Sequence, residues 1–426
     1  MNRCFLGDIA ISQTGPFGSQ LHEKDYVEEG TPIVTVEHLG DIGFTTQNLP
    51  FVSEEDTERL SKYLLQEGDI VFSRVGSIDR CVYVEKEQAG WLFSGRCLRV
   101  RCDKAKVNPR YLSYYFKLPE FKKMMMNISV GATMPSLNTK LMDSIKLILL
   151  NRSEQDRVAE FLGNIDAKIE INNKINEQLE LMAKSIYNYW FLQFDFPDKN
   201  GKPYKSSGGK MIWNGELNRE IPAGWEVSNV EHFGRLSNGI NYDKNIIGDK
   251  IYKIINVRNI SSTTLLLDKC KIEDIQLSEK IADKFLLKEN DILIARSGIP
   301  GAVRVLISDI KDTIFCGFII CLSLSSRFYR DYLVYMLKDY ENTSATTSGG
   351  TIMQNVSQET IKRLRFPVPD EGIIQLFNKK IDVIWKSMQQ KMEENQELIA
   401  LRDFLLPLLM NRQVGFKEEY KGGNTL

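Results

Sequence analysis

The chain of 426 residues contains one large unit twice, and this duplication limits its possible folds more than any other feature. The segment "EGDIVFSRVG" at 67–76 is matched by "ENDILIARSG" at 289–298. Further along, "YLSYYF" at 111–116 is matched by "YLVYML" at 332–337. Because the matches extend along each half of the chain, they indicate a duplicated unit of domain size and not a short solenoid repeat.

The first part of each unit has the pattern of a mixed globule. Residues 1–150 and 215–369 contain short apolar runs separated by Gly, Pro, Asn and Asp, and such runs predict strands. The segment "NPRYLSYYFKLPEFKKMMM" at 108–126 is typical of a helix. Each copy is therefore expected to fold as an α+β globule.

The second part of each unit has the pattern of a long helix. Apolar residues recur at spacings of three and four from Ser153 to Phe191 and again after Asp370, which predicts two coiled-coil helices. At 1.5 Å per residue, about 39 residues form a rod of about 58 Å, which is suited to act as a spacer. The expected seam residues are Val158, Leu162, Ile165, Ile169, Ile175, Leu179, Met182 and Ile186 in the first helix, and Ile374, Phe377, Ile381, Ile384, Met388, Leu398, Leu405 and Leu409 in the second.

Two asparagines interrupt these seams, Asn172 in the first and Asn395 in the second. One interpretation places both on the helix surface. The other buries them in the seam, where an Asn selects one alignment of the helices at some cost in stability. Near the end of the second helix, Pro407 predicts a terminus or a kink.

Composition and charge narrow the classes of function. With 55 Lys and Arg against 56 Asp and Glu the net charge is −1, so any contact with nucleic acid must come from local basic patches. The sequence has no apolar run of about 18 residues and no secretory signal at its N-terminus. Seven cysteines without framework spacing favour a reducing compartment. We therefore expect a cytoplasmic protein without a membrane partner.

Catalytic, cofactor and metal motifs are not recognisable in the sequence. "NLPF" at 48–51 departs from the N-P-P-F of amino-methyltransferases, and "GGKM" at 208–211 lacks the Ser or Thr of an ATP-binding loop. The C-x4-C pairs at 97–102 and 316–321 do not correspond, because aligning Gly95 with Gly317 places Cys97 opposite Ile319. We predict no catalytic residue, no metal site and no cofactor, which is typical of a scaffold that recognises a ligand.

The repeated segment ends with an Arg at a strand end before a Gly-containing loop, Arg74 in one copy and Arg296 in the other. An Arg in this place can bond guanine with both arms of its guanidinium, or contact a phosphate. The alternative is that the Arg pairs with a nearby carboxylate and orders the turn. The predicted DNA-binding residues are Arg74, Ser77, Arg80, Thr133, Arg296, Ser297, Arg304 and Thr351.

The sequence resembles the specificity (S) subunits of Type I restriction-modification systems. The resemblance rests on the duplicated "E-x-D-I-x-x-x-R-x-G" segment, on "RSEQ" at 152–155, and on the connector "WFLQFDFPDKNGKPYKSSGGKMIWNGELNREIPAGWEV" at 190–227. It extends over nearly the whole chain, from Leu6 to about Asn411.

This resemblance implies two homologous α/β target-recognition domains separated by two long antiparallel coiled-coil helices. The expected boundaries are 1–152 for the first recognition domain, 153–194 for the central helix, 195–369 for the connector and second recognition domain, 370–413 for the C-terminal helix, and 414–426 for a tail. The implied partners are bipartite double-stranded DNA, two modification (methyltransferase) subunits and, through the complex, restriction subunits. Methyl transfer and cleavage would belong to those subunits, so the chain itself is expected to be non-catalytic.

Two other classes have the same sequence features. One is the recognition subunit of a Type IIB or IIG restriction enzyme, which combines this architecture with a different cutting partner. The other is a coiled-coil adaptor that binds proteins and not DNA.

Overall fold

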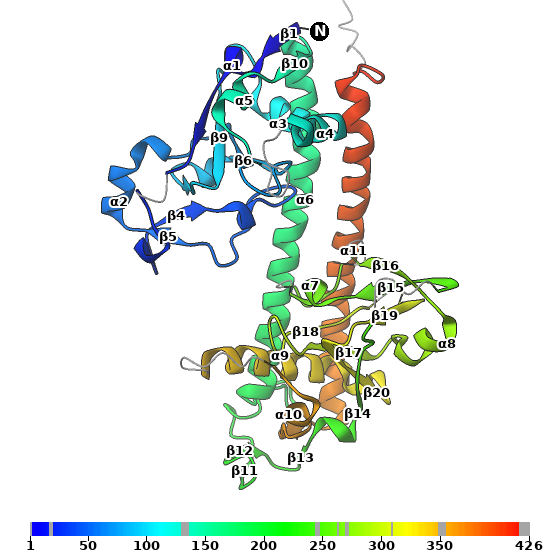
Figure 1. Cartoon of the computed structure of the whole chain (residues 1–426). Helices are drawn as coiled ribbons and strands as arrows, with labels where there is room; N and C mark the ends of the chain where they lie inside the picture. Colours follow the sequence, from blue (N-terminus) through cyan, green and yellow to red (C-terminus); the bar gives the residue numbers. More distant parts are fainter. Residues whose placement is uncertain are drawn as a thin grey trace, which may run out of the picture. The chain divides into compact units, whose positions relative to one another are not determined.

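The computed structural model describes residues 2–16, 20–128, 136–242, 248–261, 264–268, 272–307, 310–347 and 355–416. The chain forms two compact units, each with its own core. Unit 1 comprises residues 1–170 with 397–426, and unit 2 comprises residues 171–396. Both long helices, α6 (Arg152–Tyr187) and α11 (Glu371–Met410), contribute a stretch to each unit (Figure 1).

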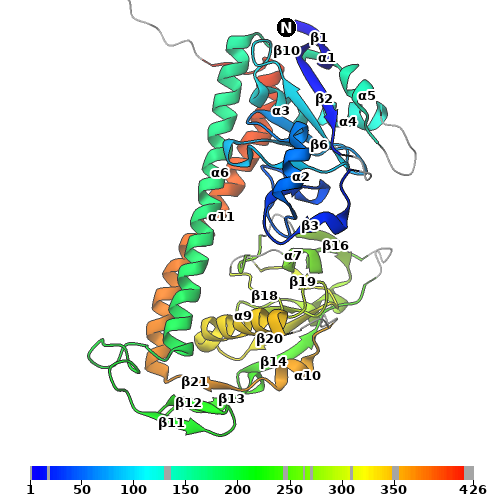
Figure 2. The same cartoon turned by 90° about the vertical axis from the view of Figure 1, so that its left-hand side faces the viewer.

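Unit 1 is built around a four-stranded antiparallel sheet. Its strand order is β2 (Ala10–Thr14), β9 (Cys97–Cys102), β6 (Asp69–Ser73) and β7 (Cys81–Tyr83). A second sheet has the order β3 (Tyr26–Val27), β5 (Phe51–Val52), β4 (Thr31–Val34) and β8 (Leu92–Phe93), and β1 (Asn2–Phe5) pairs with β10 (Lys146–Leu149). The helices are α1 (Leu6–Ile9), α2 (Glu54–Arg59), α3 (Pro109–Lys117), α4 (Pro119–Ile128) and α5 (Thr139–Asp143). In Figure 2, α3 lies beside the main sheet, where it contacts β6 and β7.

Unit 2 repeats this plan. Its main antiparallel sheet has the order β14 (Gly234–Asn238), β20 (Ile319–Leu324), β17 (Asp291–Ala295) and β18 (Val303–Arg304). The other strands are β15 (Lys250–Ile255), β16 (Glu273–Leu277) and β19 (Thr313–Phe315) in a second sheet, β13 (Glu226–Ser228) paired with β21 (Phe366–Val368), and the connector hairpin β11 (Met211–Asn214) and β12 (Arg219–Pro222). The helices are α7 (Val257–Ile260), α8 (Glu279–Ala282), α9 (Arg330–Thr347) and α10 (Gln358–Lys362). The predicted α+β fold and its internal repeat are confirmed.

The repeated segment is explained by the structure of its turn and strand. The carboxylates of Asp69 and Asp291 each accept a hydrogen bond from the backbone N–H three residues earlier, both at 2.8 Å, which fixes the turn that enters β6 or β17. The following Ile70 and Ile292 are fully buried in the two cores. At the end of the segment, the equivalent glycines have φ angles of +81° and +82°, a conformation that side chains rarely adopt.

Within each unit, α6 and α11 pack antiparallel through an apolar seam. In unit 1, Arg412 near the end of α11 bonds Glu154 near the start of α6 at 2.5 Å, and Arg402 bonds Asp166 at 2.8 Å. Most predicted seam residues are buried or half-buried. They are Val158, Leu162, Ile165, Ile169, Leu398, Leu405 and Leu409 in unit 1, and Leu179, Ile186, Ile374, Phe377, Ile381, Ile384 and Met388 in unit 2.

The predicted seam is wrong at two positions of α6. Ile175 is 37% exposed and Met182 is 55% exposed, so neither lies in the seam. The buried face continues from Ile169 at helical spacing through Asn172, Asn176, Leu179, Ala183 and Tyr187. The apolar periodicity predicts a seam of apolar side chains alone, whereas the buried seam passes through Asn172 and Asn176.

Both interrupting asparagines are buried in unit 2, which excludes the interpretation that they are surface residues. Asn172 is 0% exposed, and its side-chain amide donates to Asn395 Oδ1 at 2.8 Å. Asn395 in turn donates to Asn173 Oδ1 at 2.9 Å. A role in setting the helix register stays a prediction. α11 continues to Met410, three residues beyond Pro407, so the proline lies near the helix end as expected.

Candidate nucleic-acid interface

In unit 1, three loops meet at one end of the main sheet, where β6 ends and β7 and β9 begin. The N–H of Arg74 donates to the carbonyl of Arg96 at 2.8 Å, and the N–H of Leu137 donates to the carbonyl of Arg74 at 2.9 Å. We call this loop cluster tip 1, and it comprises residues 74–80, 94–96 and 136–137. Because backbone bonds link all three loops, tip 1 has a defined shape.

Unit 2 has an equivalent cluster, which we call tip 2 and which comprises residues 296–302, 316–318 and 355–356. The N–H of Arg296 donates to the carbonyl of Phe318 at 2.9 Å, and the N–H of Val356 donates to the carbonyl of Arg296 at 2.9 Å. These two bonds correspond one for one to those in tip 1. The two tips therefore share a backbone framework although their sequences differ.

Arg74 and Arg296 brace the two tips. The Nη1 group of each donates to a glycine carbonyl at 3.1 Å, that of Gly95 in tip 1 and that of Gly317 in tip 2. Arg74 also donates from Nε to the carbonyl of Leu137 at 3.2 Å. Both side chains are half-buried. These bonds to backbone carbonyls order the loops, and a DNA contact by either arginine stays a prediction.

The other predicted DNA-binding residues have different environments. Ser77 and Arg80 are exposed on tip 1, and Ser297 is half-buried on tip 2. Thr133 and Thr351 lie outside the described residues. For these five residues a DNA contact stays a prediction.

The prediction for Arg304 is wrong. Its side chain is 1% exposed, and its Nη1 lies 3.4 Å from the carboxylate of Glu341 on α9 and 2.6 Å from the carbonyl of Val303. Burial lowers the pKa of this guanidinium below its ordinary value. A side chain enclosed between β18 and α9 cannot reach DNA. Sequence inspection missed this because Glu341 is distant in the chain.

Two exposed residues of the tips were not predicted, Arg96 and Phe318. They occupy equivalent positions, since each follows the glycine whose carbonyl the bracing arginine holds. Arg96 is exposed, and Phe318 is 60% exposed. The alignment of Gly95 with Gly317 was the signal that pointed to the next residue in both copies.

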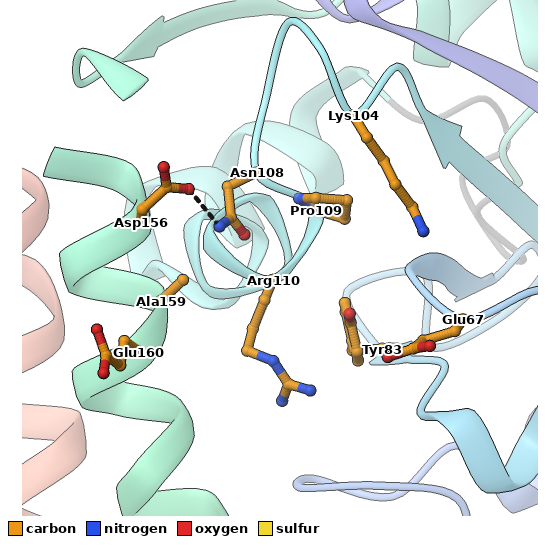
Figure 3. A pocket seen from close by; sticks show the side chains of 9 residues that line it. All are labelled: Glu67, Tyr83, Lys104, Asn108, Pro109, Arg110, Asp156, Ala159 and Glu160. Carbon is orange, nitrogen blue, oxygen red and sulfur yellow. Dashed lines mark hydrogen bonds between the residues drawn. The ribbon is translucent and has the colours of Figure 1, made fainter. Parts of the chain in front are cut away.

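At the opposite end of the same strands, unit 1 has a polar cavity of about 410 Å³. Figure 3 shows Asn108 bonded to Asp156 of α6, with Arg110 directed toward Tyr83. Arg110 makes two hydrogen bonds to Glu85, and its guanidinium carbon lies 4.2 Å from the centre of the Tyr83 ring. These bonds link α3 to α6 and to the end of the sheet beside the cavity.

Two further features concern the described ranges. Among those residues, no three His, Cys, Asp or Glu side chains are grouped as a metal site would require. Across the same part of the chain, every helix is too short or too polar to span a membrane.

Comparison with known proteins relates this architecture to one family. The profile described as "Type I restriction modification DNA specificity domain" matches residues 2–181 and again 222–399. The Type I restriction enzyme MjaIX specificity subunit of Methanocaldococcus jannaschii is 25% identical over 316 residues, 73% of this chain and 70% of that protein. The HindI specificity subunit of Haemophilus influenzae is 22% identical over 427 residues, 84% of this chain and 89% of that protein.

A solved structure shows the same fold. The crystal structure of a Type I restriction-modification S subunit from M. genitalium matches with a TM-score of 0.50 at 12% identity, and the match covers 96% of each chain. The two matched ranges cover most of both globules and most of each long helix. This chain belongs to the Type I restriction-modification DNA specificity family.

Proposed function

We propose that this specificity protein recognises a bipartite double-stranded DNA sequence, with each tip contacting one half-site. The observation that carries the proposal is the duplication of the tips, which share backbone bonds but present different exposed side chains. Shared phosphate geometry calls for a common framework, while different bases call for different side chains. Arg80 and Arg96 on tip 1 supply the local positive charge that a chain of net charge −1 needs.

An exchange of recognition domains tests this proposal. Residues 1–150 would be replaced by the corresponding part of a relative, and the chimera would be assembled with its modification subunits. Sequencing of methylated adenines should then show one altered half-site and one unchanged half-site. A change in both halves would contradict independent recognition by the two tips.

The two long helices are proposed to set the spacing between half-sites. Their support is the buried seam in each unit, together with the continuity of α6 and α11 through the unit boundary. Asn176 on α6 donates to the carbonyl of Met388 on α11 at 3.3 Å, so a lengthening must be made in both helices to keep them paired. Four residues add about 6 Å to a helix, close to the length of two base pairs.

The matched insertion is therefore four residues after Asn176 and four before Met388. The complex should methylate the same half-sites with a spacer longer by one or two base pairs. As a control, four residues inserted after Asn200, in an exposed turn of the connector, should leave the spacer unchanged. Methylation at the original spacing by the helix variant would contradict the spacer role.

Modification subunits are the proposed partners of the exposed apolar side chains on these helices. In unit 2, Ile171, Ile175, Leu181 and Met182 are exposed on α6, and in unit 1, Leu401 and Phe404 are exposed on α11. Exposed apolar clusters mark docking surfaces. The duplication favours two such subunits, which would supply methyl transfer and would recruit the restriction subunits. In a co-purification test, Met182→Glu and Phe404→Glu should each reduce the amount of bound modification subunit, whereas Glu177→Gln on exposed α6 surface should not.

A further inference from the structure

We propose that Arg96 and Phe318 are specificity-determining residues, with Arg96 bonding a guanine in one half-site and Phe318 contacting a thymine methyl group in the other. This inference rests on the proposed function and names the side chains that would carry it. Neither residue is among those that the sequence predicted to contact DNA.

Equivalent backbone positions are the first support. The carbonyls of Arg96 and Phe318 accept hydrogen bonds from the N–H groups of Arg74 and Arg296, at 2.8 and 2.9 Å. The preceding glycine carbonyls are held by the same two arginines. Because the backbone is held alike in both tips, the two side chains start from corresponding points. A half-site bound to each tip would therefore meet them at corresponding bases.

The surroundings of Arg96 favour a ligand outside the chain. Its side chain is exposed, and within the described ranges it makes no ion pair. Arg74 already donates to the carbonyl of Gly95, the residue before Arg96. A guanidinium presented in this way can bond O6 and N7 of guanine together, which no other base allows in the major groove.

Phe318 requires a different partner. It is 60% exposed, although phenylalanine is among the residues most often buried in proteins. Within the part of the chain that the structure describes, no aromatic ring is stacked on it, and it belongs to none of the four apolar cores. An apolar ring on a DNA-facing loop recognises the methyl group of thymine, the only apolar group that bases expose in the major groove.

The test uses the full chain assembled with its modification subunits and a library of DNA fragments with randomised half-sites. Methylated fragments are sequenced for the wild type and for Arg96→Ala, Arg96→Lys, Phe318→Ala and Phe318→Leu. Lys86→Ala and Trp213→Ala serve as matched controls, because both residues are exposed but lie outside the tips. Thermal unfolding of each variant checks that the fold is intact.

We expect Arg96→Ala to lose a preference for guanine at one position of one half-site, by roughly tenfold to a hundredfold, and Arg96→Lys to recover only part of it. Phe318→Ala should lose a preference for thymine at one position of the other half-site, and Phe318→Leu should keep most of it. Unchanged base preferences in both alanine variants, with a bipartite wild-type pattern, would overturn this inference and leave the proposed function standing. A wild-type complex that methylates no bipartite sequence would overturn the proposed function itself.

Discussion

Unit 1 and unit 2 share a strand order, yet they hold their main sheets together with different side chains. In unit 1, buried Asp69 accepts two hydrogen bonds from Arg101 of the neighbouring strand, at 2.7 and 2.6 Å. In unit 2, the residue opposite Asp291 in the same pairing is Ser323. Both aspartates nevertheless cap their own turn at 2.8 Å. The turn contact is therefore common to both copies of the fold, whereas the cross-strand partner differs between them.

The two units also differ in the side chains that join the recognition domain to the long helices. In unit 1, the hydroxyl of Tyr114 on α3 donates to Asp166 of α6 at 2.6 Å, and Asp166 also bonds Arg402 of α11. In unit 2, the hydroxyl of Tyr335 on α9 accepts from the indole of Trp385 on α11 at 2.9 Å. A charged network in one unit thus takes the place of a neutral bond in the other.

The largest predicted effect concerns the apolar seam, which both units share. Ile165→Asp and Ile381→Asp should each destabilise their own unit by more than about 5 kcal/mol, because each removes a buried side chain and buries an unpaired carboxylate. Amide exchange measured by mass spectrometry should rise in unit 1 for the first variant and in unit 2 for the second.

Ile175→Asp is the matched control for this pair, because Ile175 lies on the exposed side of α6. Its effect on the free energy of unfolding should stay within about 0.5 kcal/mol. A loss as large as that of Ile165→Asp would restore Ile175 to the seam and contradict the assignment made above.

A smaller difference is expected between the two capping aspartates. Asp69→Ala should cost about 3 kcal/mol, since it leaves Arg101 and the buried Arg99 without their carboxylate. Asp291→Ala should cost about 1–2 kcal/mol, the value of a buried backbone cap. Urea unfolding of the two variants tests this order, and equal losses would show that the Arg101 pair adds nothing to the sheet of unit 1.

The two tyrosine variants should differ less in their loss of stability than the two aspartate variants. Tyr114→Phe removes a hydrogen bond to a carboxylate and should cost about 1.5–3 kcal/mol, whereas Tyr335→Phe removes a neutral bond and should cost about 1 kcal/mol. Burial raises the pKa of both hydroxyls, so both remain protonated donors or acceptors at neutral pH. Thermal unfolding of the two variants gives the comparison, and a larger loss for Tyr335→Phe would contradict it.

A small effect on stability is expected at the two asparagines buried in the seam of unit 2. Replacing Asn172 and Asn395 together by Leu should leave stability unchanged or raise it by about 1 kcal/mol, because an apolar pair fills the seam. If the asparagines set the register, the variant complex should also methylate sites with more than one spacer length. A single spacer length would show that the register is set elsewhere.

Sequence inspection predicted the features that depend on repetition and on helical periodicity. The duplicated segment predicted two equivalent turns and strands, and the apolar spacing predicted the long helices. The predicted seam was wrong at Ile175 and Met182, because apolar side chains alone do not follow the helical spacing of the buried face. The side-chain amide of Asn172 donates to Asn395 across the seam, and this bond becomes apparent only when the two distant helices are paired.

The candidate interface was less predictable, for a physical reason. Exposure of a side chain in a loop depends on where the backbone is held, and the bonds that hold the tips join residues far apart in the sequence. The sequence therefore predicted a DNA contact for Arg304, although its side chain is buried beside Glu341. It did not point to the exposed Arg96 and Phe318. The sequence repeat identified the backbone framework of the two tips. The exposed residues that differ between the tips could be identified only from the structure.

The discontinuity of unit 1 has a consequence for biosynthesis. Its core includes Leu406, Leu409 and Met410, which a ribosome adds only after every residue of unit 2. Until these residues are made, the apolar face of α6 in unit 1 stays uncovered. Unit 2, in contrast, can fold as soon as its own residues emerge from the ribosome. Contacts between residues so far apart in the chain also slow refolding in solution. During this interval, unit 1 exposes apolar surface of the kind that promotes aggregation.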